Sequence, residues 1–240
     1  MVFEYDLEFI NDSGRGNTGR YFGLIMEEYP NIPAATQEVE QIRVPGHDGE
    51  LVRKGDRSNI AFSVPLTSLV PPKSQLEQRD LTRNVKNWLR GFGYLKFSDN
   101  NEARYRVLHV EVAEDNRITP TYGKYEVNFL IEPYEYAEDG FIEYTDLKFN
   151  GYDICKPIYK IYGERAGTIT VNGIEIAINV GQNLTIDTYR QLTYRTDTTE
   201  LINQGITGDY EELWLDNGPV IISASSGLSV KVIPRWGWIL

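Results

Sequence analysis

Histidine and cysteine are nearly absent from this sequence, whose 240 residues include two histidines and one cysteine. The histidines, His47 and His109, lie far apart, so a Ser-His-Asp or Cys-His catalytic set has little to draw on, and a zinc site lacks ligands at the usual spacing. Cys155 has no disulfide partner and begins the apolar segment CKPIYKIY, which favours a buried structural thiol in a chain made in a reducing compartment. We therefore predict no catalytic residue, no cofactor and no metal site.

An excess of basic residues and a long apolar run are also missing. The chain has 24 Lys+Arg against 35 Asp+Glu, a net charge of -11, which at long range repels nucleic-acid phosphates and anionic lipids. No stretch is long and apolar enough to span a membrane, and the opening MVFEYDLEFINDSG carries acids early, unlike a cleaved leader. We expect no sequence-specific nucleic-acid partner, no membrane insertion and no signal peptide.

The segments that are present have mostly the pattern of β-strands. Apolar residues alternate along IAFSVPL (60–66), RYRVLHVEV (104–112) and KYEVNFLIE (124–132), which is typical of antiparallel strands with one wet face. Tyrosine is frequent, with 16 copies, and suits sheet faces and protein interfaces. These patterns predict a mainly β fold.

One helix is predicted, over residues 74–91. Ser74 followed three positions later by Glu77 forms a capping box, and Gly91 ends the segment. Leu81, Val85, Trp88 and Leu89 share one stripe at helical spacing. We expect this stripe to cover one side of a sheet.

The pattern changes near residue 137, at the acidic, polar stretch YAEDGFIEYTD. Beyond it, strands are short and turns regular, and GTITVNGIEIAI (167–178) reads as a hairpin closed by a type I′ turn at Asn172-Gly173. Such spacing is typical of a β-sandwich. We predict an N-terminal β-barrel or sheet domain with one covering helix over residues 1–137 and a C-terminal β-sandwich over residues 138–240.

The segment RVPGHDGELVRKGD (43–56) gathers a histidine and acids between glycines. Its Pro-Gly and Asp-Gly pairs are turn chemistry, and no second histidine or nucleophile motif accompanies His47. We interpret the segment as a turn, with the next strand beginning near Ile60. The basic run at Arg53, Lys54 and Arg57, which also contains Asp56, is a candidate contact with the acids of a neighbouring subunit.

The order of segments along the chain resembles a known family. VPGHDGEL is followed by IAFSVPL, NWLRGFGYLKFSD and FLIEPYEY, and then by CKPIYKIYG, ITVNGIEIAI, LTIDT and VKVIPRWGWIL. Taken together, this ordered set resembles the distal tail protein family of long-tailed, non-contractile bacteriophages over essentially the whole chain. His47 stands where the family often has arginine, whereas Asp187 and Arg235 match family positions.

The resemblance implies a fold and a role. The expected fold is an N-terminal ring-forming β domain with one helix, followed by a galectin-like β-sandwich. The expected protein is a structural component of the virion rather than an enzyme. A hexameric ring at the distal end of the tail would link the tail-tube protein to tail-tip or baseplate proteins and to a receptor-binding protein. The chain would be synthesised in the host cytoplasm, and DNA would pass through the ring.

Two other functions remain open from the residues alone. A carbohydrate-binding module acting in host-surface recognition would stack sugars on Trp214, Trp236 and Trp238. Residues 138–240 contain no histidine, so the usual galectin site is not available. A cell-wall hydrolase would need two facing carboxylates, and no pair among the 35 acids stands out.

Overall fold

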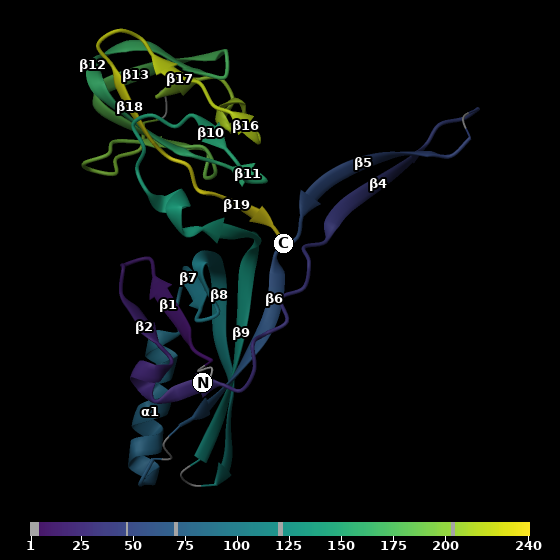
Figure 1. Ribbon diagram of the computed structural model, residues 1–240, viewed down its shortest axis with the longest axis vertical. Coiled ribbons are helices and arrows are strands. Elements are labelled where there is room, and N and C mark those ends of the chain that lie inside the picture. The colour runs from purple at the N-terminus through teal and green to yellow at the C-terminus, as the bar shows by residue number, and fades with distance from the viewer. Residues whose placement is uncertain (1–4, 47, 70–71, 120–121, 203–204) are drawn as a thin grey trace. The chain divides into compact units, whose positions relative to one another are not determined.

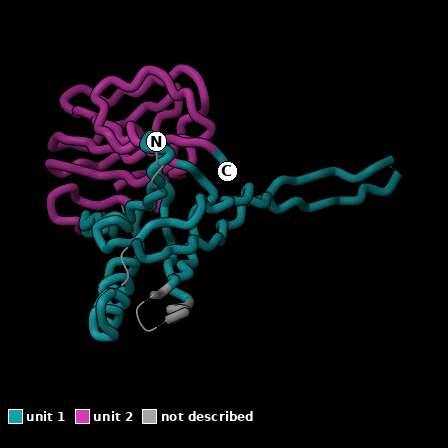
Figure 2. The backbone as a smooth tube through the Cα atoms, turned by 60° about the horizontal axis from the view of Figure 1, so that its bottom comes forward, with its two compact units in different colours: residues 1–135, 239–240 teal, residues 136–238 magenta. Residues whose placement is uncertain are grey.

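The computed structural model describes residues 5–240 except 47, 70–71, 120–121 and 203–204. The chain divides into two compact units (Figure 2), which are Met1–Glu135 with Ile239–Leu240, and Tyr136–Trp238. The last two residues group with unit 1 because the Leu240 N–H donates to the Pro133 carbonyl at 3.2 Å and its carbonyl accepts from Ala35 at 2.9 Å. The two units are described separately below.

Unit 1 contains one large sheet (Figure 1) in which neighbouring strands follow the order β3-β6-β9-β8-β7-β1-β2. The strands are β1 Leu7–Asn11, β2 Gly16–Thr18, β3 Leu24–Met26, β6 Ile60–Ser68, β7 Gly93–Phe97, β8 Asn100–Thr119 and β9 Tyr122–Ala137; a short 3-10 turn, η1, spans Arg20–Phe22. Within the described ranges β2 and β3 do not pair with each other, so the sheet is open rather than a closed barrel.

The alternation of apolar residues expected in β6 and β9 is found, and it determines which face of the sheet is buried. Ile60, Phe62, Val64 and Leu66 of β6 are all buried, and they pair in antiparallel register with the buried residues of β9, which are Tyr125, Val127, Phe129 and Ile131. Strand β7 lies close to β1 at Gly93, where a Cβ would lie 2.4 Å from the Ile10 carbonyl oxygen. A side chain at that position would push the two strands apart.

The predicted helix is confirmed as α1, Gln75–Trp88, the one α-helix of the described chain. The Ser74 hydroxyl caps it by accepting from the Glu77 N–H at 3.2 Å. The Glu77 carboxylate accepts from Lys73 at 2.7 Å rather than from the cap residue itself. Val85 and Trp88 pack into the unit 1 core, so the helix covers one face of the sheet, as expected.

Strands β4, Gln37–Arg43, and β5, Glu50–Arg57, form a separate two-stranded antiparallel ladder. This hairpin, here called the arm, extends away from the unit 1 sheet (Figure 1). The described residues between 38 and 56 are all exposed, so the arm adds nothing to the unit 1 core.

Unit 2 is built on the long hairpin of β12, Ile158–Val171, and β13, Ile174–Asp187. Its turn is at Asn172-Gly173, with φ of 48° and 90°, which confirms the predicted type I′ turn. Six strands join this sheet in the order β14-β13-β12-β17, with β15 beside β13 and β18 beside β12. The other elements are β10 Phe149–Asn150, β11 Ile154–Cys155, β14 Leu192–Tyr194, β15 Ile206–Thr207, β16 Gly218–Pro219, β17 Ile222–Ala224, β18 Ser229–Ile233 and β19 Trp236–Ile239, with 3-10 turns η2 Glu138–Phe141 and η3 Tyr210–Leu213.

The unit 2 core is mainly aliphatic and contains a buried ion pair. Tyr159, Ile161, Ile169, Val171, Ile176, Ile178, Leu184 and Ile186 line the hairpin side of this core. The Arg235 guanidinium pairs with Asp187, which also accepts from the Arg190 N–H at 2.9 Å. Arg235 has a φ of 47°, in the left-handed region, so the backbone at this point is held against its own preference. Asp187 and Arg235, which both match family positions in the sequence, are therefore in contact.

Together these elements confirm a mainly β fold with one covering helix. The predicted hairpin over residues 167–178 is also found, in β12 and β13.

Candidate assembly site: the β4–β5 arm

The arm is the part of the described chain whose side chains are least explained by the packing of their own unit. Its turn uses glycines in the left-handed region, Gly46 with φ of 81° and Gly49 with φ of 91°. His47, which stands in place of the family arginine, lies outside the described residues. The sequence interpretation found this turn but placed the next strand at Ile60, so it missed the strands on either side of the turn.

The register of the arm places apolar side chains on both of its faces. Val39 pairs with Lys54 and Gln41 with Val52, which puts Val39 and Val52 on one face. Ile42 pairs with Leu51, and these two residues lie on the other face. All four are exposed, with fractions of 54% for Val39, 58% for Val52, 41% for Ile42 and 52% for Leu51.

A hairpin of this kind needs a partner. An isolated two-stranded hairpin is at best marginally stable in water, because it cannot shield its apolar side chains. Burying one Val, Leu or Ile side chain contributes about 1.5–3 kcal/mol. The arm exposes such side chains on two faces. A partner that contacted only one face would therefore leave the apolar side chains of the other face in water. The arrangement fits an arm that another molecule covers on both faces.

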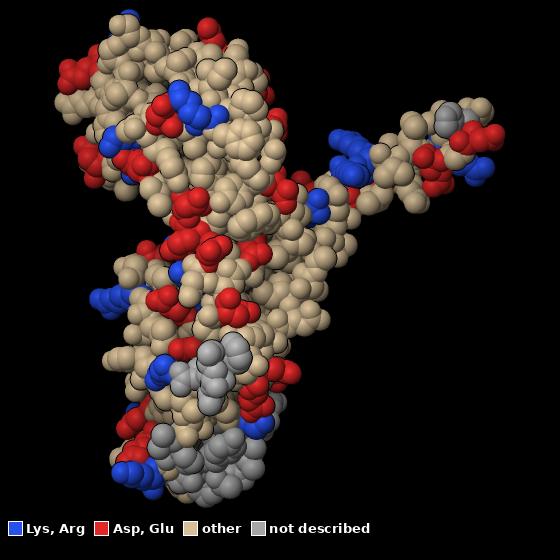
Figure 3. Space-filling view, viewed as in Figure 1, with Lys and Arg blue, Asp and Glu red and all other residues tan. Residues whose placement is uncertain are grey.

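The charged side chains of the arm, like the apolar ones, lie on both of its faces. Arg53 pairs with Glu40 across the ladder at 3.9 Å, with both side chains largely exposed, and such pairs contribute little to stability. Lys54 lies on the opposite face from Arg53, and Arg57 is half-buried at the base of the arm, opposite Gln37. The predicted basic run is therefore not one contact surface. Figure 3 shows charges of both signs along the arm, separated by uncharged side chains.

A β-bulge interrupts the register of the arm near its base. The register shifts between Gln37, opposite Arg57, and Val39, opposite Lys54, so β5 has one residue more than β4 at this point. Gly55 and Asp56 of β5 thus lie opposite the single residue Glu38 of β4. At Gly55, a Cβ would approach Glu38 Cβ at 3.1 Å. A bulge adds twist and redirects a strand, so we expect this position to influence the course of the arm.

The three tryptophans expected for sugar stacking do not form a shared platform. The Trp214 ring is covered by the Lys156 ammonium at 4.3 Å, and its Nε1–H donates to the Thr188 carbonyl at 3.4 Å. Trp236 is buried, stacks on Tyr152 at 5.0 Å between ring centroids, and donates to Asp139. Of the three, Trp238 is the most exposed, at 39%, and its ring meets Tyr152 edge-on.

The residues weighed for chemistry are dispersed. His109 is exposed on β8, whereas Cys155 is buried, where its Sγ–H donates to the Pro234 carbonyl at 3.1 Å and burial raises the pKa of the thiol. The described residues hold no cluster of His, Cys, Asp and Glu suited to a metal ion. Among those same residues, no helix is both long and apolar enough to cross a membrane.

Solved structures with the same fold come from bacteriophages. The SPP1 Dit protein, described as a paradigm of the hub of adsorption apparatus in phages infecting Gram-positive bacteria, aligns over 95% of this chain and 97% of its own with a TM-score of 0.62 and 11% identity. A chain of the phage P2 baseplate in its activated conformation with calcium aligns over 97% of this chain and 98% of its own, with a TM-score of 0.56 and 12% identity. The strontium form gives a TM-score of 0.57 and 12% identity, over 95% and 97% of the two chains. No family model and no curated protein sequence matches.

Proposed function

We propose that this chain is a structural hub of a bacteriophage tail, which assembles as a hexameric ring at the distal end of the tail. The observation that supports this most is the likeness in fold to the SPP1 Dit protein over 95% of the chain. Because both chains are spanned almost completely, the likeness includes both units. The proposed role is structural, and we expect no catalytic activity.

The arm supplies a physical reason for ring assembly. In a ring, each subunit presents one surface to the subunit ahead and a different surface to the subunit behind, and the rotation between them closes. An arm with two unshielded apolar faces is suited to lie between surfaces of a neighbouring copy. We propose that residues 1–137 form the ring and that the arm of each copy packs against the next.

The remaining partners follow from the same proposal. One side of the ring would bind the tail-tube protein, and the other would bind tail-tip or baseplate proteins and a receptor-binding protein. The region over residues 138–240 would be the galectin-like sandwich on the outside of the hub. DNA would pass through the central opening, and a net charge of -11 on each chain is compatible with such passage because it disfavours binding.

The arm can be removed without breaking its base, which gives a direct test. Gln37 and Arg57 are register partners, so replacing residues 38–56 by Asn-Gly joins them through a two-residue hairpin turn. We expect the intact chain to show a mass of six times 27.5 kDa by native mass spectrometry and a six-fold ring in negative stain. The shortened chain should be a monomer that still unfolds cooperatively in a thermal melt followed by circular dichroism.

Point variants separate the arm's apolar faces from general surface changes. Leu51→Asp and Val52→Asp each place a charge on one face of the arm, and both should weaken assembly by at least about tenfold in dissociation constant. Ile174→Asp is the matched control, because Ile174 is also an exposed aliphatic beside a hairpin turn, but in unit 2. A shortened chain that still forms the six-fold ring would show that the arm does not hold the subunits together. An intact chain that stays monomeric at high concentration, with and without a tail-tube protein, would contradict the hub proposal itself.

A further inference from the structure

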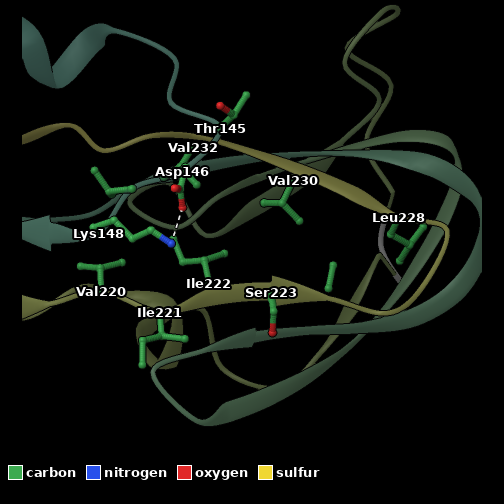
Figure 4. A pocket seen from close by; sticks show the side chains of 12 residues that line it. Thr145, Asp146, Lys148, Val220, Ile221, Ile222, Ser223, Leu228, Val230 and Val232 are labelled. Carbon is green, nitrogen blue, oxygen red and sulfur yellow. Dashed lines mark ion pairs between the residues drawn. The ribbon is translucent and has the colours of Figure 1, made fainter.

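Unit 2 has a cavity at its edge that the proposed ring does not use. The cavity has a volume of 270 Å³ and lies between β17, β18 and residues 145–148 (Figure 4). We call it the edge slot; its apolar lining includes Leu147, Val220, Ile222, Leu228, Val230 and Val232. Figure 4 shows Ile222 and Val230 pointing into the space from opposite walls, whereas Ile221 and Ser223 point away from it.

The slot exists because β17 and β18 pair with different parts of the same strand. Strand β18 pairs with residues 158–162 of β12, and β17 pairs with residues 169–171. Between these two parts, Gly163 has a φ of 146°, and a Cβ there would lie 2.5 Å from Leu228 Cδ2. Strand β12 therefore passes from one wall to the other at a glycine, and β17 and β18 are left as two separate edges.

The outer edge of β17 has backbone groups without a strand partner. Ile221 accepts from the Asn172 N–H at 2.9 Å and Ser225 donates to the Thr168 carbonyl at 3.0 Å, so the odd-numbered residues bond toward β12. By the alternation of an antiparallel ladder, Ile222 and Ala224 direct their N–H and C=O groups away from β12. In the part of the chain that the structure describes, no hydrogen bond joins these outward groups to another segment.

Residues 145–147 cross the slot instead of pairing with this edge. Tyr144 exchanges two backbone hydrogen bonds with Val232, both at 2.8 Å, and the Lys148 carbonyl accepts from Val220 at 2.8 Å. Continued from either end, the register would bring Asp146 opposite Val230 or opposite Ile222, and in the described structure it pairs with neither. Residues 145–147 thus pass from one edge to the other and leave both incomplete.

The lining selects among ligand classes. It contains no aromatic ring, and most of its lining residues are aliphatic, beside the polar residues Thr145, Asp146, Lys148 and Ser223. This lining suits an apolar side chain rather than a sugar. Its volume is slightly below the range of about 300–1,000 Å³ that is typical of small-molecule sites. The mouth carries Asp146 and Lys148, paired at 2.6 Å with both side chains largely exposed, so moving this pair aside has a small energetic penalty.

We propose that the edge slot binds an extended peptide segment of a partner protein. The segment adds as a strand to the outer edge of β17, where its backbone bonds to Ile222 and Ala224, and it inserts one aliphatic side chain between β17 and β18. Strand addition takes its affinity from main-chain hydrogen bonds and its specificity from such a side-chain pocket. This inference concerns unit 2 and holds whether or not unit 1 forms a ring.

The test uses the full-length chain and synthetic nine-residue peptides of alternating threonine and valine, with Ile, Leu, Phe or Gly at the centre. Fluorescence anisotropy measures the affinity, and hydrogen–deuterium exchange locates the site. We expect saturable binding of the Ile and Leu peptides, at least about tenfold tighter than the Gly peptide, with protection confined to residues 145–148 and 219–232. A peptide N-methylated at the amide that faces β17 should lose binding, whereas one methylated at the next amide should keep it.

Two substitutions of Ala224 separate the backbone contribution from the slot. Ala224→Pro removes an outward N–H that β12 does not use, and Ala224→Leu fills the slot; each should weaken binding at least about tenfold. Ser223→Leu is the matched control, because it makes a similar increase in size on the face pointing away from the slot, and it should change affinity by less than about twofold. Thermal melting checks that each variant is folded. The proposal is overturned if no peptide binds saturably up to about 1 mM, if protection maps elsewhere, or if the N-methylated peptides bind alike.

Discussion

The arm and the β12–β13 hairpin are built alike and used differently. Each is a two-stranded antiparallel ladder closed by left-handed glycines, Gly49 with φ of 91° in the arm and Gly173 with φ of 90° in unit 2. The β12–β13 hairpin buries one face in the unit 2 core, whereas no described side chain between residues 38 and 56 is buried. The same local geometry thus serves once as the centre of a fold and once as a surface that only another molecule can cover.

The difference lies in how apolar residues are placed on the two faces. In β13, the buried residues Ile176, Ile178 and Val180 follow a strict period of two, so one face is apolar. In the arm, Leu51 and Val52 are adjacent and therefore point to opposite faces. A hairpin that fits its own unit has one apolar face, and a hairpin that fits between molecules can have two.

The ion pairs of the two hairpin regions should show the largest contrast. Asp187→Ala leaves Arg235 without its carboxylate in a mostly buried position, which should lower the free energy of unfolding of unit 2 by about 4 kcal/mol. The matched change in the arm, Glu40→Ala, removes the exposed partner of Arg53 and should change stability by less than about 1 kcal/mol. Urea denaturation followed by tryptophan fluorescence reports on both units, because Trp214, Trp236 and Trp238 lie in unit 2 and Trp88 lies in the unit 1 core. Equal effects of the two substitutions would contradict the contrast between the regions.

Two isoleucines make the same comparison through packing alone. Ile161 is fully buried in β12, and Ile161→Ala should cost about 3 kcal/mol because it leaves a cavity. Ile42 is exposed in the arm, and Ile42→Ala should change the stability of the dissociated chain by less than about 0.5 kcal/mol. In the proposed ring the difference between the two substitutions should be smaller, because Ile42 would then be covered. Denaturation at two protein concentrations, above and below ring dissociation, measures both effects; a ring in which Ile42→Ala has no effect would show that this face of the arm stays exposed.

Features set by neighbouring residues could be predicted from the sequence. The Ser74 cap and the Asn172-Gly173 turn depend on a few adjacent positions, and both are found where expected. The alternation of Ile60, Phe62 and Val64 also predicted which residues are buried. In each case the feature depends on residues of a single element, so it can be predicted without knowing which distant segments lie beside it.

Features set by distant segments could not be predicted in the same way. On β8, burial shifts from Tyr105 and Val107 to Val110, so the single face expected for the strand is not kept. The arm was missed because its apolar residues follow no single period, and that signal appears only once the register is known. The edge slot depends on where residues 145–148 cross between two strands, which the local sequence does not specify.

Charge at the surface of unit 2 gives the smallest expected effect. Glu143 accepts from the Lys160 and Lys231 ammonium groups at 2.8 and 2.7 Å, and these hydrogen bonds hold the pKa of its carboxyl below the usual value. A carboxyl whose pKa is lower in the folded state adds stability above its unfolded pKa and loses it as pH falls through the folded value. We expect Glu143→Gln to lower the melting temperature slightly at neutral pH and to leave it unchanged near about pH 2.

Salt distinguishes this surface effect from that of the buried pair. The Glu143 side chain is 31% exposed, whereas Asp187 is 3% exposed, so about 1 M salt should remove most of the Glu143 contribution and little of the Asp187 contribution. Melting curves of the parent chain, Glu143→Gln and Asp187→Ala, taken across pH at low and high salt, make the comparison within one unit. A Glu143 effect that persists in high salt and at low pH would mean that this side chain acts through packing. The different exposure of Glu143 and Asp187 would then not explain how their ion pairs respond to salt.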